Sequence, residues 1–383
     1  MSTLNAGKVF LSSGLILPEY TTANLPTIPQ GAELGLLVFD TTAQKMKVFN
    51  GSSWIAFDDN TMAASGGSNT YTAGSYTIHK FTGDGTFTVS RAGNAEVLVV
   101  AGGGGGGGSH QGGGGGGAGG LVYHPSKYFP VGSYSVTVGG GGQGGRYYSG
   151  STSGNYGTTN NSHGFQGGNS QIADILAIGG GGGNESFYTN SVYKDGGSGG
   201  GGGDYYTGVG SYAWAGGRAM QMNSGGGIGF GNPGGTRGYG TCEEVENNSH
   251  ETPHEGSGGG GAGGVGGKAM GTATDVQGSA TDGGIGLYFS QFASYGGDPG
   301  GWFAGGGGGG FYWYGPYTPT NAPGGNNGSY GGGGRGYGGQ SATGNTAGVA
   351  NTGGGGGGGS GNNTPPNALP GGSGVVLIRY KAG

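Results

Sequence analysis

Short runs of apolar and β-branched residues, separated by polar turns, recur along the chain and predict β-strands. Near the N-terminus these runs are Leu36–Phe39, Met46–Phe49 and Trp54–Phe57. The turn before the third run contains Asn50-Gly51, a strong hairpin signal. This pattern predicts a small β-meander. Alone it is too small to bury much surface, so we expect it to dock onto a partner or to oligomerise.

A second group of strand-like runs begins further along the chain, at Tyr76–Phe81, Thr86–Val89 and Glu96–Ala101. The last run of the chain, Gly374–Tyr380 (GVVLIRY), is similar in character to Glu96–Ala101 (EVLVVA). We infer that these two runs pair in one sheet. The long region between them is then held at both ends.

Three segments follow from these patterns. Residues 1–62 form an N-terminal β-module, and residues 63–75 form a polar linker. Residues 76–383 form a glycine-rich domain whose β-sandwich-like base consists of 76–101 and 374–381.

Glycine runs interrupt the strand pattern, and 113 of the 383 residues are glycine. The longest stretch, Ala101–Gly120, is almost entirely backbone. A strict Gly-X-Y period is absent and prolines are few, which excludes collagen. The runs are either flexible linkers or structural members that bond to one another through peptide groups. Their recurrence after strand-like segments favours the second interpretation, because polyglycine can form an extended threefold helix whose N–H groups bond laterally. The predicted fold is therefore mostly β, with a bundle of polyglycine II helices and variable loops.

The inserts between the glycine runs are rich in Tyr, Ser, Gly and Asn, the composition of binding loops. Their aromatic residues are the candidate binding residues: Tyr147, Tyr148, Tyr156, Phe187, Tyr188, Tyr193, Tyr205, Tyr206, Tyr212, Trp214, Phe311, Tyr312, Trp313, Tyr314 and Tyr317. A second interpretation is that these side chains cover the glycine bundle as a substitute core.

The charge and the cysteine content of the chain argue against several classes of function. The net charge is −5, with only 9% charged residues, so nothing suggests binding to nucleic acid or anionic lipid. A single cysteine, Cys242, excludes an internal disulfide framework and a cysteine-based zinc site. The N-terminus lacks the apolar core of a secretory signal, so we expect synthesis in a cytoplasm without export.

Catalytic motifs occur only in forms that do not support catalysis. His250–His254 spells H-E-x-x-H, but zinc chemistry needs both histidines on one face of a helix, and Pro253 disfavours that helix. A solvated acidic loop is the expected state. Because glycine is so common, G-x-G-x-x-G carries no nucleotide signal. We expect no enzyme activity, no metal and no cofactor.

FTGDGTFTV, EVLVVAGGGGGGG and the closing GGSGVVLIRYKA resemble glycine-rich domains of bacteriophage virion proteins. The alternation of glycine runs with Tyr/Ser/Asn-rich inserts is also similar to the receptor-binding tail-fibre adhesins of T-even-type phages. That resemblance implies a sandwich of polyglycine helices with receptor-binding loops at its tip. The N-terminal GLLVFDTTAQKMKVFNGSSWIAF is similar to short β-modules common in phage fibre and other structural proteins, which implies attachment to other virion proteins.

The resemblance gives the functional expectation. The chain would be a non-enzymatic adhesin of the virion that binds a host outer-membrane protein or surface polysaccharide, without a nucleic-acid partner. It leaves open whether the chain acts as a homotrimer. Three alternatives remain: a structural head, neck or capsid fibre without receptor recognition, an ice-binding protein, and an enzyme such as a depolymerase.

Overall fold

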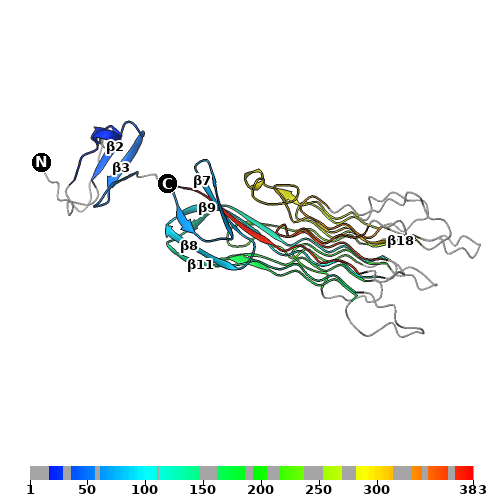
Figure 1. Cartoon of the computed structure of the whole chain (residues 1–383). Coiled ribbons are helices and arrows are strands. Elements are labelled where there is room, and N and C mark those ends of the chain that lie inside the picture. The colour runs from blue at the N-terminus through cyan, green and yellow to red at the C-terminus, as the bar shows by residue number, and fades with distance from the viewer. Residues whose placement is uncertain are drawn as a thin grey trace, which may run out of the picture. The chain divides into compact units, whose positions relative to one another are not determined.

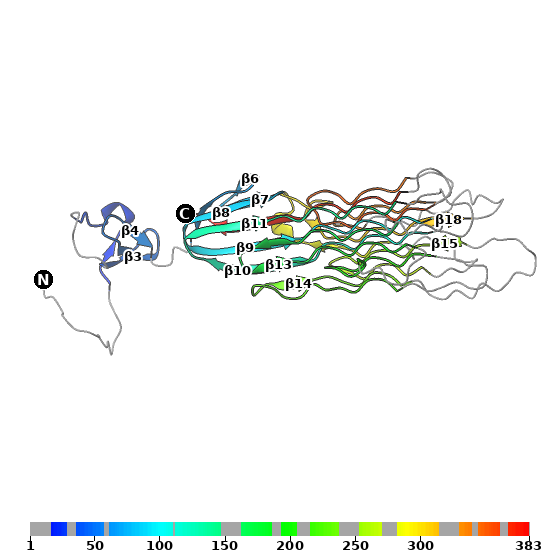
Figure 2. The same cartoon turned by 90° about the horizontal axis from the view of Figure 1, so that it is seen from below.

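The computed structural model describes residues 17–28, 36–56, 61–109, 112–146, 162–185, 193–204, 215–236, 253–269, 282–313, 329–338, 344–360 and 367–382. The chain divides into two compact units, unit 1 (Met1–Thr61 with Gly383) and unit 2 (Met62–Ala382). Regular structure in the described residues is β, apart from two short 3-10 helices, η1 (Thr22–Asn24) and η2 (Ser290–Phe292). The prediction of a mostly β fold is confirmed (Figures 1 and 2).

Unit 1 is a four-stranded sheet in the order β1-β2-β3-β4. Its strands are β1 (Glu19–Tyr20), β2 (Leu37–Asp40), β3 (Lys45–Phe49) and β4 (Trp54–Ala56). The meander β2-β3-β4 is antiparallel, as predicted, and β1 joins β2 in parallel. Asn50 shapes the turn before β4, because its side-chain oxygen accepts hydrogen bonds from the backbone of Ser52 and Ser53.

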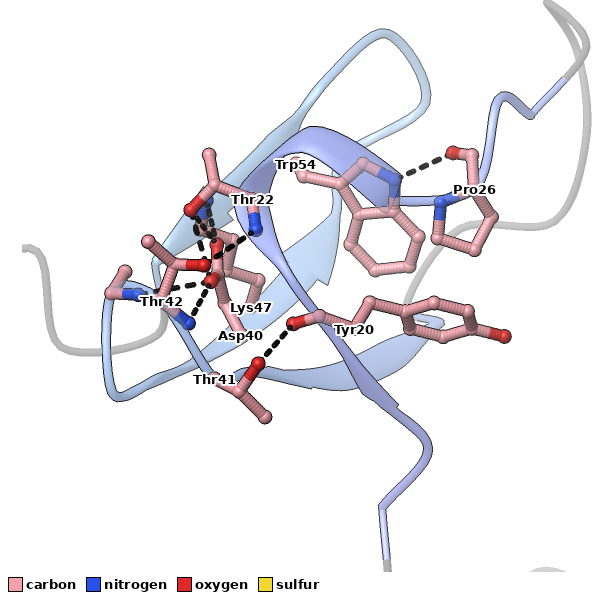
Figure 3. A network of polar contacts seen from close by, with 9 residues as sticks. Tyr20, Thr22, Pro26, Asp40, Thr41, Thr42, Lys47 and Trp54 are labelled. Carbon is pink, nitrogen blue, oxygen red and sulfur yellow. Dashed lines mark hydrogen bonds and ion pairs between the residues drawn. The ribbon is translucent and has the colours of Figure 1, made fainter.

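A buried carboxylate ties unit 1 together (Figure 3). Asp40 is fully buried at the end of β2 and accepts hydrogen bonds from the Thr22 hydroxyl and from the backbone N–H groups of Thr42 and Ala43. The Lys47 ammonium lies 2.8 Å from its carboxylate. The Lys47 hydrogen bond, followed by that from Ala43, holds the pKa of Asp40 well below its usual range. Asp40 thus connects η1, the β2–β3 turn and β3.

Two sheets of unit 2 share one core. The first has the order β14-β10-β9-β19-β7-β6 and the second β13-β12-β11-β8-β5. Side chains of both, including Phe81, Phe87, Phe129, Ile172 and Ile378, pack into one buried cluster. The strands are β5 (Ala63–Ser65), β6 (Asn69–Ala73), β7 (Tyr76–Phe81), β8 (Gly85–Arg91), β9 (Gly93–Val100), β10 (Leu121–Phe129), β11 (Gly132–Thr137), β12 (Ser170–Ile172), β13 (Ile175–Ala177), β14 (Ile228–Phe230) and β19 (Val375–Lys381).

The predicted pairing of the first and last strands of the glycine region is confirmed. β9 and β19 are antiparallel neighbours, with Val100 opposite Val375 and Glu96 opposite Arg379. The other face of their sheet is also covered. There, Leu98 and Leu377 pack with Phe292 and Phe303, which belong to the segment between β16 (Leu287–Tyr288) and the end of β17 (Trp302–Phe303). Burial on both faces explains why these two strands read as continuous apolar runs rather than alternating ones.

The segment 63–75, expected to be a linker, contains strands β5 and β6. β5 pairs with β8, and β6 pairs with β7. Both are edge strands of their sheets. In β6 (NTYTA), Asn69, Thr70 and Thr72 are exposed, so polar residues fit there. The polar composition that indicated a linker is the composition of an edge strand.

The described glycine runs extend away from the sheets side by side in both views (Figures 1 and 2). Their N–H groups are hydrogen-bonded to other runs in a repeating order. In Gly102–Gly108, residues 102, 105 and 108 donate to the segment 162–168, residues 103 and 106 to 369–372, and residues 104 and 107 to 114–117. The run Gly113–Gly120 repeats this, donating in turn to 353–359, to 178–184 and to 257–260. The bonding direction therefore has a period of three residues.

The runs approach one another too closely for side chains. A Cβ atom added at Gly104 would overlap the carbonyl oxygen of Gly181. At positions such as Gly104 the neighbouring backbone thus requires glycine. The linker interpretation does not fit these runs.

Candidate functional site

Four of the predicted inserts are Arg146–His163, Asn184–Asp195, Asp204–Met222 and Phe311–Tyr317. Their described starts lie together at the end of unit 2 away from its sheets, which we call the distal end. Gly113 donates to Gly359 and Gly359 to Gly107, each at 2.9 Å, while Gly310 donates to Gly113 at 2.8 Å. Asp204, Asn184 and Gly145, each at or next to the start of an insert, bond to runs of this group at Gly112, Gly114 and Gly106. Phe311, the first residue of the fourth insert, follows Gly310 directly.

Most predicted binding residues lie outside the described part of the chain. These are Tyr147, Tyr148, Tyr156, Phe187, Tyr188, Tyr205, Tyr206, Tyr212, Trp214, Tyr314 and Tyr317. Phe311, Tyr312 and Trp313 form strand β18 (Phe311–Trp313), which pairs with β15 (Pro253–Glu255). The composition of this insert predicts a binding loop that includes Phe311–Trp313. Its backbone is instead fixed by two neighbours, β15 and Tyr337, whose carbonyl accepts the Phe311 N–H.

Tyr193 is the predicted binding residue whose side-chain contacts are best defined. Its ring stacks on His163, with centroids 4.8 Å apart and an angle of 9° between the planes. Phe165 packs against both rings. Tyr193 remains 39% exposed, whereas His163 is buried, and burial lowers the pKa of His163. Tyr193 therefore both covers the bundle and presents surface, so the two interpretations of the insert aromatics apply to one residue.

Buried polar side chains collect at the distal end. Asn184, Glu185 and Asp204 are each less than 5% exposed. Burial raises the pKa of Glu185 to about 7, since the charged form loses its hydration. In the described residues, no group of three or more His, Cys, Asp or Glu side chains is placed to hold a metal.

The H-E-x-x-H sequence reaches the described residues only at its end. Pro253 and His254 belong to β15, an extended strand. Zinc binding by this motif needs a helix that carries both histidines on one face. Extended backbone at Pro253–Glu255 does not provide it.

A second group of aromatic residues lies on the flank of unit 2 and was missed by sequence reasoning. Tyr288 of β16 (Leu287–Tyr288), Trp302 of β17 (Trp302–Phe303) and Tyr330 are consecutive neighbours in space. They are 14 and 28 residues apart in the sequence, so no local cluster marks them. The sequence does contain one signal for this group. Two short apolar segments, Leu287–Tyr288 and Trp302–Phe303, are separated by a stretch that contains Gly and Pro and could pair as a hairpin.

A family model described as a glycine-rich domain matches residues 80–381. The chain belongs to this glycine-rich domain family. The glycine-rich domain thus runs from the end of β7 through β19, and unit 1 lies outside it. No curated protein matches the chain. No helix in the described residues is long and apolar enough to cross a membrane.

Proposed function

We propose that the chain is a non-enzymatic adhesin of a bacteriophage particle. Inserts at the distal end of the glycine-rich domain bind an outer-membrane protein or surface polysaccharide of the host. Unit 1 attaches the chain to other virion proteins. The protein is made in the host cytoplasm and acts on the virion.

In this proposal, the scaffold that carries the inserts is a bundle of polyglycine II helices. The supporting observation is the three-residue period in the bonding direction of Gly102–Gly108 and Gly113–Gly120. A threefold extended helix points successive N–H groups in three directions, 120° apart. A flat strand would alternate between two directions, so the period favours polyglycine II.

The observation that carries the adhesin proposal is the gathering of the insert starts at the distal end. The described starts of inserts with binding-loop composition lie together there, while the sheets lie at the other end of the glycine runs (Figure 1). A rigid scaffold that presents several variable segments at one end is a common arrangement for recognition.

Exchange of the inserts tests the proposal. Two variants of the chain are made, one with residues 205–214 and one with residues 315–328 replaced by a Gly-Ser segment of equal length. Adsorption to host cells is measured for particles that carry each variant. We expect adsorption to fall at least about tenfold, as when the anchor residues of an interface are removed. A Tyr128→Ala variant on β10, in the sheet region, is the control, since Tyr128 is exposed there. Unchanged adsorption in both insert variants contradicts the proposal and favours a structural fibre.

A further inference from the structure

Tyr288, Trp302 and Tyr330 form an aromatic row on the flank of unit 2. The ring centroids of Tyr288 and Trp302 are 5.4 Å apart, and those of Trp302 and Tyr330 are also 5.4 Å apart. The interplanar angles are 42° and 40°. Tyr288 is 51% exposed and Tyr330 57% exposed, and Trp302 is partly exposed. The row is a continuous surface of aromatic rings open to solvent.

The aromatic row is not needed as core. The segment that carries Tyr288 and Trp302 covers the six-stranded sheet with Phe292 and Phe303, which are both fully buried. Trp302 and Phe303 are adjacent on β17, so their side chains point to opposite faces of that strand. One face completes the core, and the other presents the row.

Backbone contacts hold the row in place. Tyr288 lies opposite Trp302 in the β16–β17 pair, and the Gly301 carbonyl accepts the N–H of Phe289 at 2.8 Å. The Tyr330 carbonyl accepts the N–H of Gly286, also at 2.8 Å. Gly301 has φ of +87°, and a Cβ atom there would lie 2.7 Å from the Tyr288 ring. Because the backbone that carries the rings is fixed before a ligand arrives, binding loses less ordering entropy than it would on an unstructured loop.

The polar atoms of the row are free. In the described chain, neither the Tyr288 and Tyr330 hydroxyls nor the Trp302 indole N–H forms a hydrogen bond, and both tyrosines are more than half exposed. An indole N–H only donates, so a ligand must offer it an acceptor. Within positions 283–304, which carry Tyr288 and Trp302, Asp298 is the one charged residue.

From these features we propose that the aromatic row binds a neutral polysaccharide built of pyranose rings. Such a ring has an apolar C–H face that stacks on an aromatic face and a rim of hydroxyls that meets the free donors. Three aromatic rings in succession match a polymer of sugar rings better than a single small molecule. This inference draws its biological role from the proposed adhesin function, but its chemistry is independent of the inserts.

Affinity electrophoresis of the purified full chain tests the proposal. Native gels contain dextran, mannan or hydroxyethylcellulose, and a polymer-free gel gives the reference mobility. We expect at least one polymer to retard the chain. Trp302→Ala and Tyr330→Ala should each raise the dissociation constant for that polymer about tenfold, because they remove stacking area at the centre and the end of the row.

Two further variants separate stacking from other effects. Tyr330→Phe keeps the ring and removes the hydroxyl, so we expect a smaller increase in the dissociation constant than for Tyr330→Ala. Tyr128→Ala removes a tyrosine of similar exposure, 58%, on β10 and should change nothing. The thermal unfolding midpoint of each variant is measured beside its binding.

Several results overturn the proposal. One is that none of the three polymers retards the chain. Another is that Trp302→Ala binds like the original chain with its fold intact. A third is that sedimentation shows self-association abolished by Trp302→Ala without any polysaccharide binding, which makes the row a contact between copies. Loss of adsorption on insert exchange with unchanged gel retardation would separate the adhesin function from this site.

Discussion

At the residue scale, neighbouring backbone decides which glycines of the bundle accept a side chain. A Cβ atom at Gly104 would overlap the carbonyl oxygen of Gly181, whereas one at Gly140 would meet nothing within 4 Å. Both residues have hydrogen-bonded backbone, so the two sites differ mainly in the space around them.

We therefore expect Gly104→Ala to lower the free energy of unfolding by about 1–3 kcal/mol, the usual effect of overpacking. Gly140→Ala is the matched control and should be neutral or slightly stabilising, because alanine restricts the unfolded chain. Urea unfolding followed by circular dichroism gives both values. Equal effects of the two substitutions would contradict the close approach at Gly104.

The buried Glu185 should make the stability of unit 2 depend on pH. Its folded pKa of about 7 lies above the ordinary 4.5, because burial disfavours the charged carboxylate. Its full contribution to stability is therefore present below pH 4.5 and is lost as the pH rises through about 7. The loss is on the order of 3 kcal/mol, as each pKa unit corresponds to about 1.4 kcal/mol.

We expect Glu185→Gln to raise the thermal unfolding midpoint of unit 2 at pH 8 and to change it little at pH 5. The midpoint is measured by calorimetry across this range. Glu19→Gln, at an exposed site on β1, serves as control and should leave the pH profile unchanged. A Glu185→Gln profile parallel to that of the original chain would show that Glu185 is charged in the fold.

At the scale of the element, the glycine runs behave as bonded structure rather than as connections. Every N–H group of Gly102–Gly108 donates to a neighbouring run, at distances of 2.6–3.0 Å. Each such bond contributes only about 1 kcal/mol net, so the stability of the runs depends on many bonds formed together.

We expect the amides of Gly102–Gly108 to exchange with solvent as slowly as those of β9, the strand that leads into the run. Gly74, in the turn between β6 and β7, is the internal reference for a fast amide. Hydrogen exchange followed by mass spectrometry or NMR measures the rates. Exchange in Gly102–Gly108 as fast as in an unfolded peptide would restore the linker interpretation.

At the scale of the whole molecule, the two units have separate cores and separate sources of stability. Unit 1 has a small core, with Val38 and Phe49 buried, and the Asp40 network of Figure 3. Unit 2 has two apolar clusters and the bonded glycine runs. Because the pKa of Asp40 is lowered in the fold, its contribution to unit 1 is present above pH 3.8, its ordinary pKa, and is lost as the pH falls through the lower folded value.

We expect Asp40→Asn to lower the unfolding midpoint of unit 1 at pH 7 and to leave that of unit 2 unchanged. In the full chain, the Trp54 indole resonance reports unit 1, since this N–H donates to the Pro26 carbonyl at 2.9 Å. The amides of β9 report unit 2. Midpoints that shift together would show that the units unfold as one.

The sequence by itself determined the β fold, the meander of unit 1 and the pairing of β9 with β19. In each case side chains carry the information, through apolar runs, β-branched residues and turn residues such as Asn50-Gly51. The recurrence of the glycine runs after strand-like segments also indicated that these runs are structural. Edge strands β5 and β6 were missed because polar edge strands and polar linkers have the same composition.

Only the tertiary structure decided which run each glycine bonds to. A run such as Gly102–Gly108 has seven identical residues, so nothing in its sequence distinguishes the N–H group that donates to Gly168 from the one that donates to Gly372. The aromatic row arose in the same way, because Tyr288, Trp302 and Tyr330 meet only when their separate segments pack together. Local sequence patterns specify elements, whereas contacts between distant backbone segments are chosen by the packing of the whole domain.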